Sequence, residues 1–202
     1  MSSVPGGTAY PYQVEVFMQC YSAIVAWNNA HDKLRASLPP EPAQQLSVAM
    51  SVIGDLQAFL VAAGILSDLF FPDPKKGDIA RGQVLRDLYR MKLDSPLANK
   101  KVRNSFVHVD ERLDAWLSTQ AGKGNAVGPF SIAHWDGPAP TTEQSTHLRV
   151  LDNKNWRIMV RGEPLELLPL LKEIDRIARK FPLTVNTPAG PVALAFEPAR
   201  YV

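Results

Sequence analysis

Two long segments with almost no charge dominate the N-terminal half, and prolines separate them. No Asp, Glu, Lys or Arg lies between Glu15 and Asp32, so a helix there would be apolar on most sides and buried on more than one face. We predict a helix over residues 12–38, ended by Pro39-Pro40, and a second over residues 42–70. In a chain this short, another subunit can cover the second face of the first helix.

Two more helices are expected before residue 120. A short one spans about residues 79–91, and Ser95-Pro96 then gives a helix start signal, with Ser95 as N-cap and proline at the first position. The helix that follows should continue to about Ser118. One apolar stripe supports it, at steps of four, three, four and three, formed by Val102, Phe106, Val109, Leu113 and Trp116.

The C-terminal part changes character. Residues 121–146 read as a long connection with a short strand at 130–132, followed by a hairpin with strands at 148–151 and 156–160. A helix over 167–181 and a strand near 192–196 complete the chain. The sequence therefore predicts a mainly α protein: a helical bundle over residues 1–120 and a hairpin–helix appendage over residues 121–202.

Composition limits the classes of function. The net charge is only +2 over 202 residues, so nucleic-acid affinity has to come from a local patch. Cys20 is the only cysteine, which excludes a disulfide framework and a cysteine zinc site, and we interpret it as a small core residue. The histidines lack metal-ligand spacing, so we predict no metal and no cofactor. We expect a cytoplasmic protein without a membrane segment, because the charge-free run between Asp55 and Asp68 is too short to span a bilayer.

The polar side of the predicted fourth helix carries the candidate chemistry. Arg103 keeps its charge at any working pH, Asn104 offers a planar amide, and His108 titrates near neutrality. These groups can hold a phosphodiester and move a proton at it. Lys100 and Lys101 lie beside them in the first turns, where the helix dipole disfavours cations unless an anion binds there. We therefore predict that both lysines bind a phosphate, such as an RNA phosphate; the alternative is a solvated basic turn whose charge is offset by Asp94 or by an acidic neighbour in space.

The spacing also sets a geometric condition on this site. Asn104 and His108 are four residues apart and share a helix face, with Glu111 one turn further on, able to orient the imidazole. Arg103 and His108 are about 140° apart around the helix. A second, antiparallel copy of the helix would bring both groups to one point.

The run Arg103-Asn104-Ser105-Phe106-Val107-His108 resembles the R-x(4–6)-H motif of the HEPN superfamily. The resemblance implies a four- or five-helix bundle and a homodimer with two motifs facing one cleft. Catalytic members are metal-independent endoribonucleases, in which the equivalent of His108 acts as base or acid at the ribose 2′-hydroxyl. The equivalent of Arg103 stabilises charge on the phosphate, and Asn104 would hold the histidine or the phosphate. A cognate protein partner is also implied.

Two alternatives stay open from the sequence. One is a non-catalytic HEPN-like module that binds a protein or a nucleotide through the same cleft. The other is a structural helical bundle in which the polar side of the fourth helix faces solvent. Burial of Arg103 and His108 in a cleft between two copies would favour the nuclease or the non-catalytic binding module over the structural bundle.

Overall fold

The protein is mainly α, as predicted, in a computed structural model that describes residues 9–37, 39–75, 78–99, 114, 117–118, 131–133, 149–160, 163–180, 183–188, 190–194 and 196–201. The helices within these ranges are α1 (Ala9–Arg35), α2 (Pro42–Phe70), α3 (Ile79–Tyr89), the short 3-10 helix η2 (Pro96–Ala98) and α6 (Leu167–Ala178). The strands are β1 (Ser131–Ala133), β2 (Arg149–Asp152), β3 (Arg157–Val160), β4 (Glu163–Glu166), β5 (Leu183–Thr187) and β6 (Gly190–Leu194).

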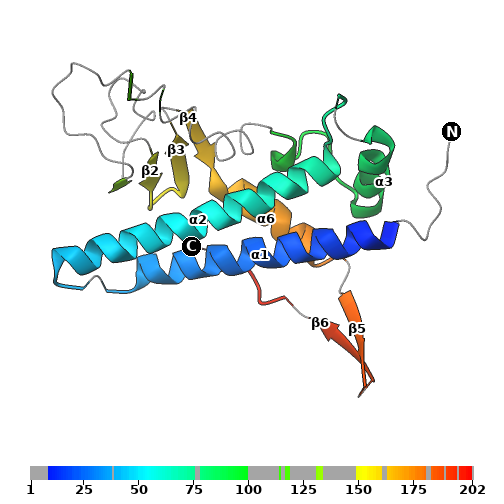
Figure 1. The fold of residues 1–202 in the computed structure, drawn as a ribbon, viewed down its shortest axis with the longest axis horizontal. Helices are drawn as coiled ribbons and strands as arrows, with labels where there is room; N and C mark the ends of the chain where they lie inside the picture. The colour runs from blue at the N-terminus through cyan, green and yellow to red at the C-terminus, as the bar shows by residue number, and fades with distance from the viewer. Residues whose placement is uncertain are drawn as a thin grey trace.

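The two long helices form an antiparallel hairpin, with α1 and α2 side by side along most of their length (Figure 1). Pro42 opens α2 at the predicted residue, and Phe70 ends it just before Pro72. Lys33 of α1 donates to Ser51 and Asp55 of α2, at 2.6 and 2.5 Å. These two hydrogen bonds fix the axial position of α1 relative to α2.

One core joins the helical hairpin to the C-terminal half. Trp27 of α1 is fully buried, and its ring lies 5.4 Å from Phe59 of α2 and 4.4 Å from Trp156, between centroids. Helix α6 packs on α1 with a strongly apolar side. That side consists of Leu167, Leu170, Leu171, Ile174, Ile177 and Ala178. The division at residue 120 stays a prediction, but this core draws on both sides of it.

The predicted hairpin is confirmed to within one residue. Strands β2 and β3 pair antiparallel, with Val150 opposite Met159. Two features were not predicted: β4 extends the sheet beyond β3, and β1 pairs in parallel with β2, which gives the order β1-β2-β3-β4. Trp156, expected in a strand, lies in the turn with φ of 51°.

The C-terminal segment covers a second side of α1. Strand β6 falls close to the predicted strand and pairs with β5, which was not predicted, in a hairpin that projects from the helices (Figure 1). Residues 196–201 then return to α1. Phe196 packs on Phe17 at 4.6 Å between ring centroids, and Trp27 Nε1 donates to the Arg200 carbonyl at 2.8 Å. Part of the apolar surface of α1 is therefore covered by the C-terminal segment of the same chain.

The predicted continuous helix from Pro96 to Ser118 is wrong at its start. Ser95 caps as expected, accepting from the Leu97 N–H, but only a three-residue 3-10 helix follows. Asn99 then has extended backbone, with φ of −75° and ψ of 101°. Leu97 is fully buried and η2 packs on both α2 and α6. Core packing therefore holds a single turn here, although Asp114, Leu117 and Ser118 are helical.

Candidate functional site

The residues predicted to carry the chemistry lie outside the described part of the chain. They are Lys100, Lys101, Arg103, Asn104, His108 and Glu111. Their geometry, and the convergence of Arg103 with His108 across two copies, therefore stay predictions. The segment that leads into them is described as far as Asn99, and it borders a charged pocket.

This cationic pocket, as we call it, has a volume of about 310 Å³ and joins two distant parts of the sequence. The loop after α3 contributes one wall and α6 the other. Its lining residues are Arg90, Lys92, Asp94, Ser95, Pro96, Glu173 and Arg176. The Ser95-Pro96 signal that marked the sequence therefore lies in the wall of a pocket, five residues before Lys100.

A fixed ion pair forms the α6 wall of the cationic pocket. Arg176 donates to Glu173 twice, from Nε at 2.8 Å and from Nη2 at 3.0 Å. Its Nη1 donates to the Tyr89 carbonyl at 2.9 Å. Ser95 Oγ adds a further bond to Glu173 at 3.1 Å. Burial works to raise the pKa of Glu173, but the bonds from Arg176 and Ser95 and the nearby charges hold that pKa below its ordinary value.

The opposite wall presents cations in an unusual backbone setting. Arg90 is the C-cap of α3 and has left-handed φ and ψ of 49° and 47°, a conformation more common for glycine or asparagine. Arg90 and Lys92 are both exposed. Lys180 follows Arg176 by one helical turn. Partial burial, and then the positive charges of Arg90 and Arg176, lower the pKa of Lys180. The pocket lining thus contains three cations, Arg90, Lys92 and Arg176, and two carboxylates, Asp94 and Glu173.

This arrangement can bind an anion but offers no acid–base catalyst. Arginine and lysine side chains around a concave surface suit phosphate groups. Glu173, held ionised by Arg176 and Ser95, is poorly placed to exchange protons near neutral pH. If the chain cleaves a bond, the described pocket supplies binding, and the proton transfer has to come from elsewhere, with His108 as the predicted source.

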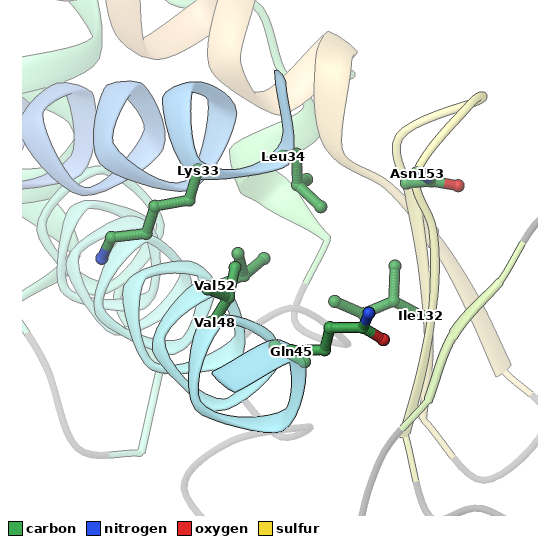
Figure 2. A pocket seen from close by; sticks show the side chains of 8 residues that line it. Lys33, Leu34, Gln45, Val48, Val52, Ile132 and Asn153 are labelled. Carbon is green, nitrogen blue, oxygen red and sulfur yellow. The ribbon is translucent and has the colours of Figure 1, made fainter. Parts of the chain in front are cut away.

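A second pocket, about 320 Å³, lies between the end of α1, the start of α2, β1 and the turn after β2. Figure 2 shows Leu34, Val48, Val52 and Ile132 around it, with the Lys33 ammonium group turned away. That ammonium group is engaged by Ser51 and Asp55. Gln45 and Asn153 add neutral amides. The lining therefore suits an apolar group and lacks a reactive side chain.

Two further described side chains that could carry chemistry, His31 and Cys20, lie in the core. His31 is buried and stacks on Trp156 at 5.8 Å between ring centroids. Cys20 is fully buried, as interpreted from sequence, and burial raises the pKa of its thiol. Within the described ranges, no three His, Cys, Asp or Glu residues gather as metal ligands. Trp27 and Trp156 are core residues.

Sequence reasoning missed the cationic pocket, because its two walls are more than 75 residues apart in the chain. The only local signal was a cluster of basic residues, Arg86, Arg90 and Lys92, around the end of α3. Comparison with known proteins adds no guide: no family model, no curated protein and no solved structure matches the chain.

Helix α2 bears on the expectation that the chain has no membrane segment. By length and composition alone it could cross a bilayer, since uncharged residues lie on both sides of Asp55, which is the only charged residue of the helix before Asp68. A core helix can pass the same test, and 44% of the relevant stretch is buried within the protein.

Proposed function

We propose that the protein is RNA-directed: a HEPN-like, metal-independent endoribonuclease in which Arg103, Asn104 and His108 act on a phosphodiester. The cationic pocket is the observation that carries the RNA part of this proposal. Five of its lining residues, from Arg90 to Pro96, come within the ten residues before Lys100 in the sequence, and its arginine and lysine side chains suit the phosphates of an RNA backbone.

The distribution of charge also supports RNA binding at this pocket. The chain as a whole is nearly neutral, at +2, so a phosphate-binding surface has to be local. Arg90 and Lys92 line the pocket, and the charge of Lys180 interacts with that of Arg90. Together with Lys100 and Lys101 they would offer the repeated phosphate contacts that nucleic-acid binding depends on.

The proposed chemistry is internal transfer at the ribose. The 2′-oxygen attacks the adjacent phosphorus, the bond from phosphorus to the 5′-oxygen breaks, and the 2′ proton is replaced by one on the leaving 5′-oxygen. His108 takes or gives one of these protons. Arg103 neutralises the charge that develops on the phosphate oxygens, and Asn104 orients the phosphate or the imidazole. The products are a 2′,3′-cyclic phosphate and a 5′-hydroxyl.

A homodimer is part of this proposal, because one helix would hold Arg103 and His108 about 140° apart. The alternative function is binding without cleavage, of RNA, a nucleotide or a protein partner. One observation favours it: the described pocket provides cations but no group suited to acid–base catalysis. Lys100 and Lys101 would then serve the same binding surface.

A cleavage assay separates these functions. Mixed RNA is incubated in excess EDTA with the wild type, His108→Ala and Arg103→Ala, and the product ends are analysed. We expect wild-type cleavage to cyclic phosphate ends and a loss of about 100-fold or more in each variant. Lys154→Ala, in an exposed hairpin turn, is the matched control and should cleave like the wild type. Equal cleavage by all four proteins, or none by any, would remove the nuclease proposal. RNA binding without cleavage would support the alternative.

A further inference from the structure

The outer side of α2 carries exposed apolar residues in a regular row. Leu46, Met50, Val61 and Ile65 are 56, 58, 45 and 38% exposed. Gly54 and Ala58 lie between them and are also exposed. Steps of four, four, four, three and four keep all six on one helix face. We call this row the α2 outer face; it is about 28 Å long.

The α2 outer face lacks charge, and α2 contains no Lys or Arg at all. Its central carboxylate, Asp55, is turned toward α1, where Lys33 pairs with it at 2.5 Å. Helices that lie on a lipid surface normally carry basic residues beside their apolar face. An exposed apolar row of this length, without such residues, is typical of a protein contact surface.

The order of residues along the α2 outer face reads nearly the same in both directions. Leu46 and Ile65, Met50 and Val61, and Gly54 and Ala58 are three pairs whose midpoints all fall at or beside Leu56. In an antiparallel two-fold contact, a residue i that meets j requires j to meet i. A reversed copy of α2 would therefore place large side chains against large ones at both ends.

The small residues fall where two such helices would be closest. Close approach of packed helices depends on the side chains at the crossing point. An added Cβ at Gly54 would meet nothing within 4 Å in the chain itself. The space over Gly54 and Ala58 is thus open to another helix, and an unrelated partner would give no reason for the matched order.

We propose that the α2 outer face is the contact surface of an antiparallel homodimer, with the two-fold axis at the level of Leu56. The contact needs only the described helix and does not depend on RNA binding. It goes beyond the proposed function by assigning the face through which two copies meet. Failure of the cleavage assay in a dimeric protein would leave this contact standing. A monomeric wild type would remove the contact and the two-copy site of Arg103 and His108, and would leave only RNA binding without cleavage.

Sedimentation velocity of the full chain tests the face. We expect the wild type to approach twice the 22.3 kDa mass of one chain as its concentration rises. Val61→Glu and Gly54→Arg should be monomers with unchanged helical circular dichroism, because both positions are exposed. Ile79→Glu, at an apolar α3 residue that is 53% exposed, is the control and should remain a dimer. A monomeric wild type, or dimers in all variants, would overturn the proposal.

Cross-linking tests the direction. Single cysteines replace Leu46 or Ile65, and a short bismaleimide is added; buried Cys20 should not react. We expect cross-linked dimers only when the Leu46→Cys and Ile65→Cys proteins are mixed. Cross-linking of Leu46→Cys with itself would indicate a parallel contact and overturn the assignment. Wild type that stays monomeric but binds anionic phospholipid vesicles, with binding lost in Val61→Glu, would overturn it in favour of a membrane surface.

Discussion

Arg176 holds Glu173 through two hydrogen bonds, of 2.8 and 3.0 Å, while its third nitrogen bonds the carbonyl of Tyr89, 87 residues earlier in the chain. This contact joins α6 to the end of α3 and shapes the cationic pocket. Because Arg176 already neutralises the Glu173 carboxylate, Glu173 does not compete with a bound phosphate for the other cations of the pocket.

Glu173→Gln should lower the free energy of unfolding by about 0.5–1 kcal/mol at neutral pH, since Arg176 is 40% exposed and water screens the pair. The lowered pKa of Glu173 fixes the sign of the pH dependence. Its contribution is full above the unfolded value of about 4.5 and is lost as the pH falls through the lower folded value. Urea unfolding at neutral and acidic pH should therefore show a difference between wild type and variant that shrinks on acidification. A constant difference would contradict this role.

Replacement of two glycines by alanine should change the free energy of unfolding in opposite directions. At Gly82 in α3, an added Cβ would lie 2.5 Å from Pro72 Cδ and 2.8 Å from Pro72 Cγ, so Gly82→Ala should destabilise by about 1–3 kcal/mol. At Gly54 in α2 the space is open, and Gly54→Ala should stabilise by about 0.5–1 kcal/mol through helix propensity. Thermal unfolding at low protein concentration compares the two variants. Destabilisation by both would mean that Gly54 is packed.

Asn28 should anchor the C-terminal segment. Its buried side chain accepts from the Arg200 N–H at 2.9 Å and donates to the Pro198 carbonyl at 3.2 Å. Asn28→Ala leaves both backbone groups without this partner and should cost about 1–3 kcal/mol. Asn29 is exposed next to it, and Asn29→Ala should change stability by less than about 0.5 kcal/mol. Limited proteolysis near residue 196 should accelerate only in Asn28→Ala; equal rates would place the anchor elsewhere.

Cys20 should resist modification in the folded protein. Its side chain is fully buried, and burial raises the pKa of the thiol, so little thiolate is present to react. Iodoacetamide labelling followed by mass spectrometry should be slow in the native state and rapid in urea. Fast native labelling would show that the packing of α1 against its neighbours opens readily.

Local signals in the sequence predicted the helical part well. Pro42 marked the start of α2 to the residue, and the run ending before Pro72 marked its end. The apolar side of α6 was readable because it repeats at helical spacing. Such signals act within a few residues, so they do not need the rest of the fold.

Most of the features that failed depend on distant residues. Ser95-Pro96 has the chemistry of a helix start, but burial of Leu97 against α2 and α6 limits the result to one 3-10 turn. The contact of Phe196 with Phe17 joins segments 179 residues apart. Strand β5 was missed although only two residues separate it from β6. The cationic pocket also depends on distant residues, since Arg90 and Arg176 line one pocket only when α6 packs beside the loop after α3.

The RNA-directed function is tested most directly by binding of a labelled single-stranded RNA, followed by fluorescence anisotropy at several salt concentrations. Wild type should bind, and its affinity should fall steeply with salt. Lys92→Glu, in the cationic pocket, should weaken binding and make the slope of log Kd against log salt shallower by about 1. Lys154→Glu, on an exposed turn away from that pocket, should bind like the wild type. No wild-type binding, or the same curve for all three proteins, would contradict the proposed function.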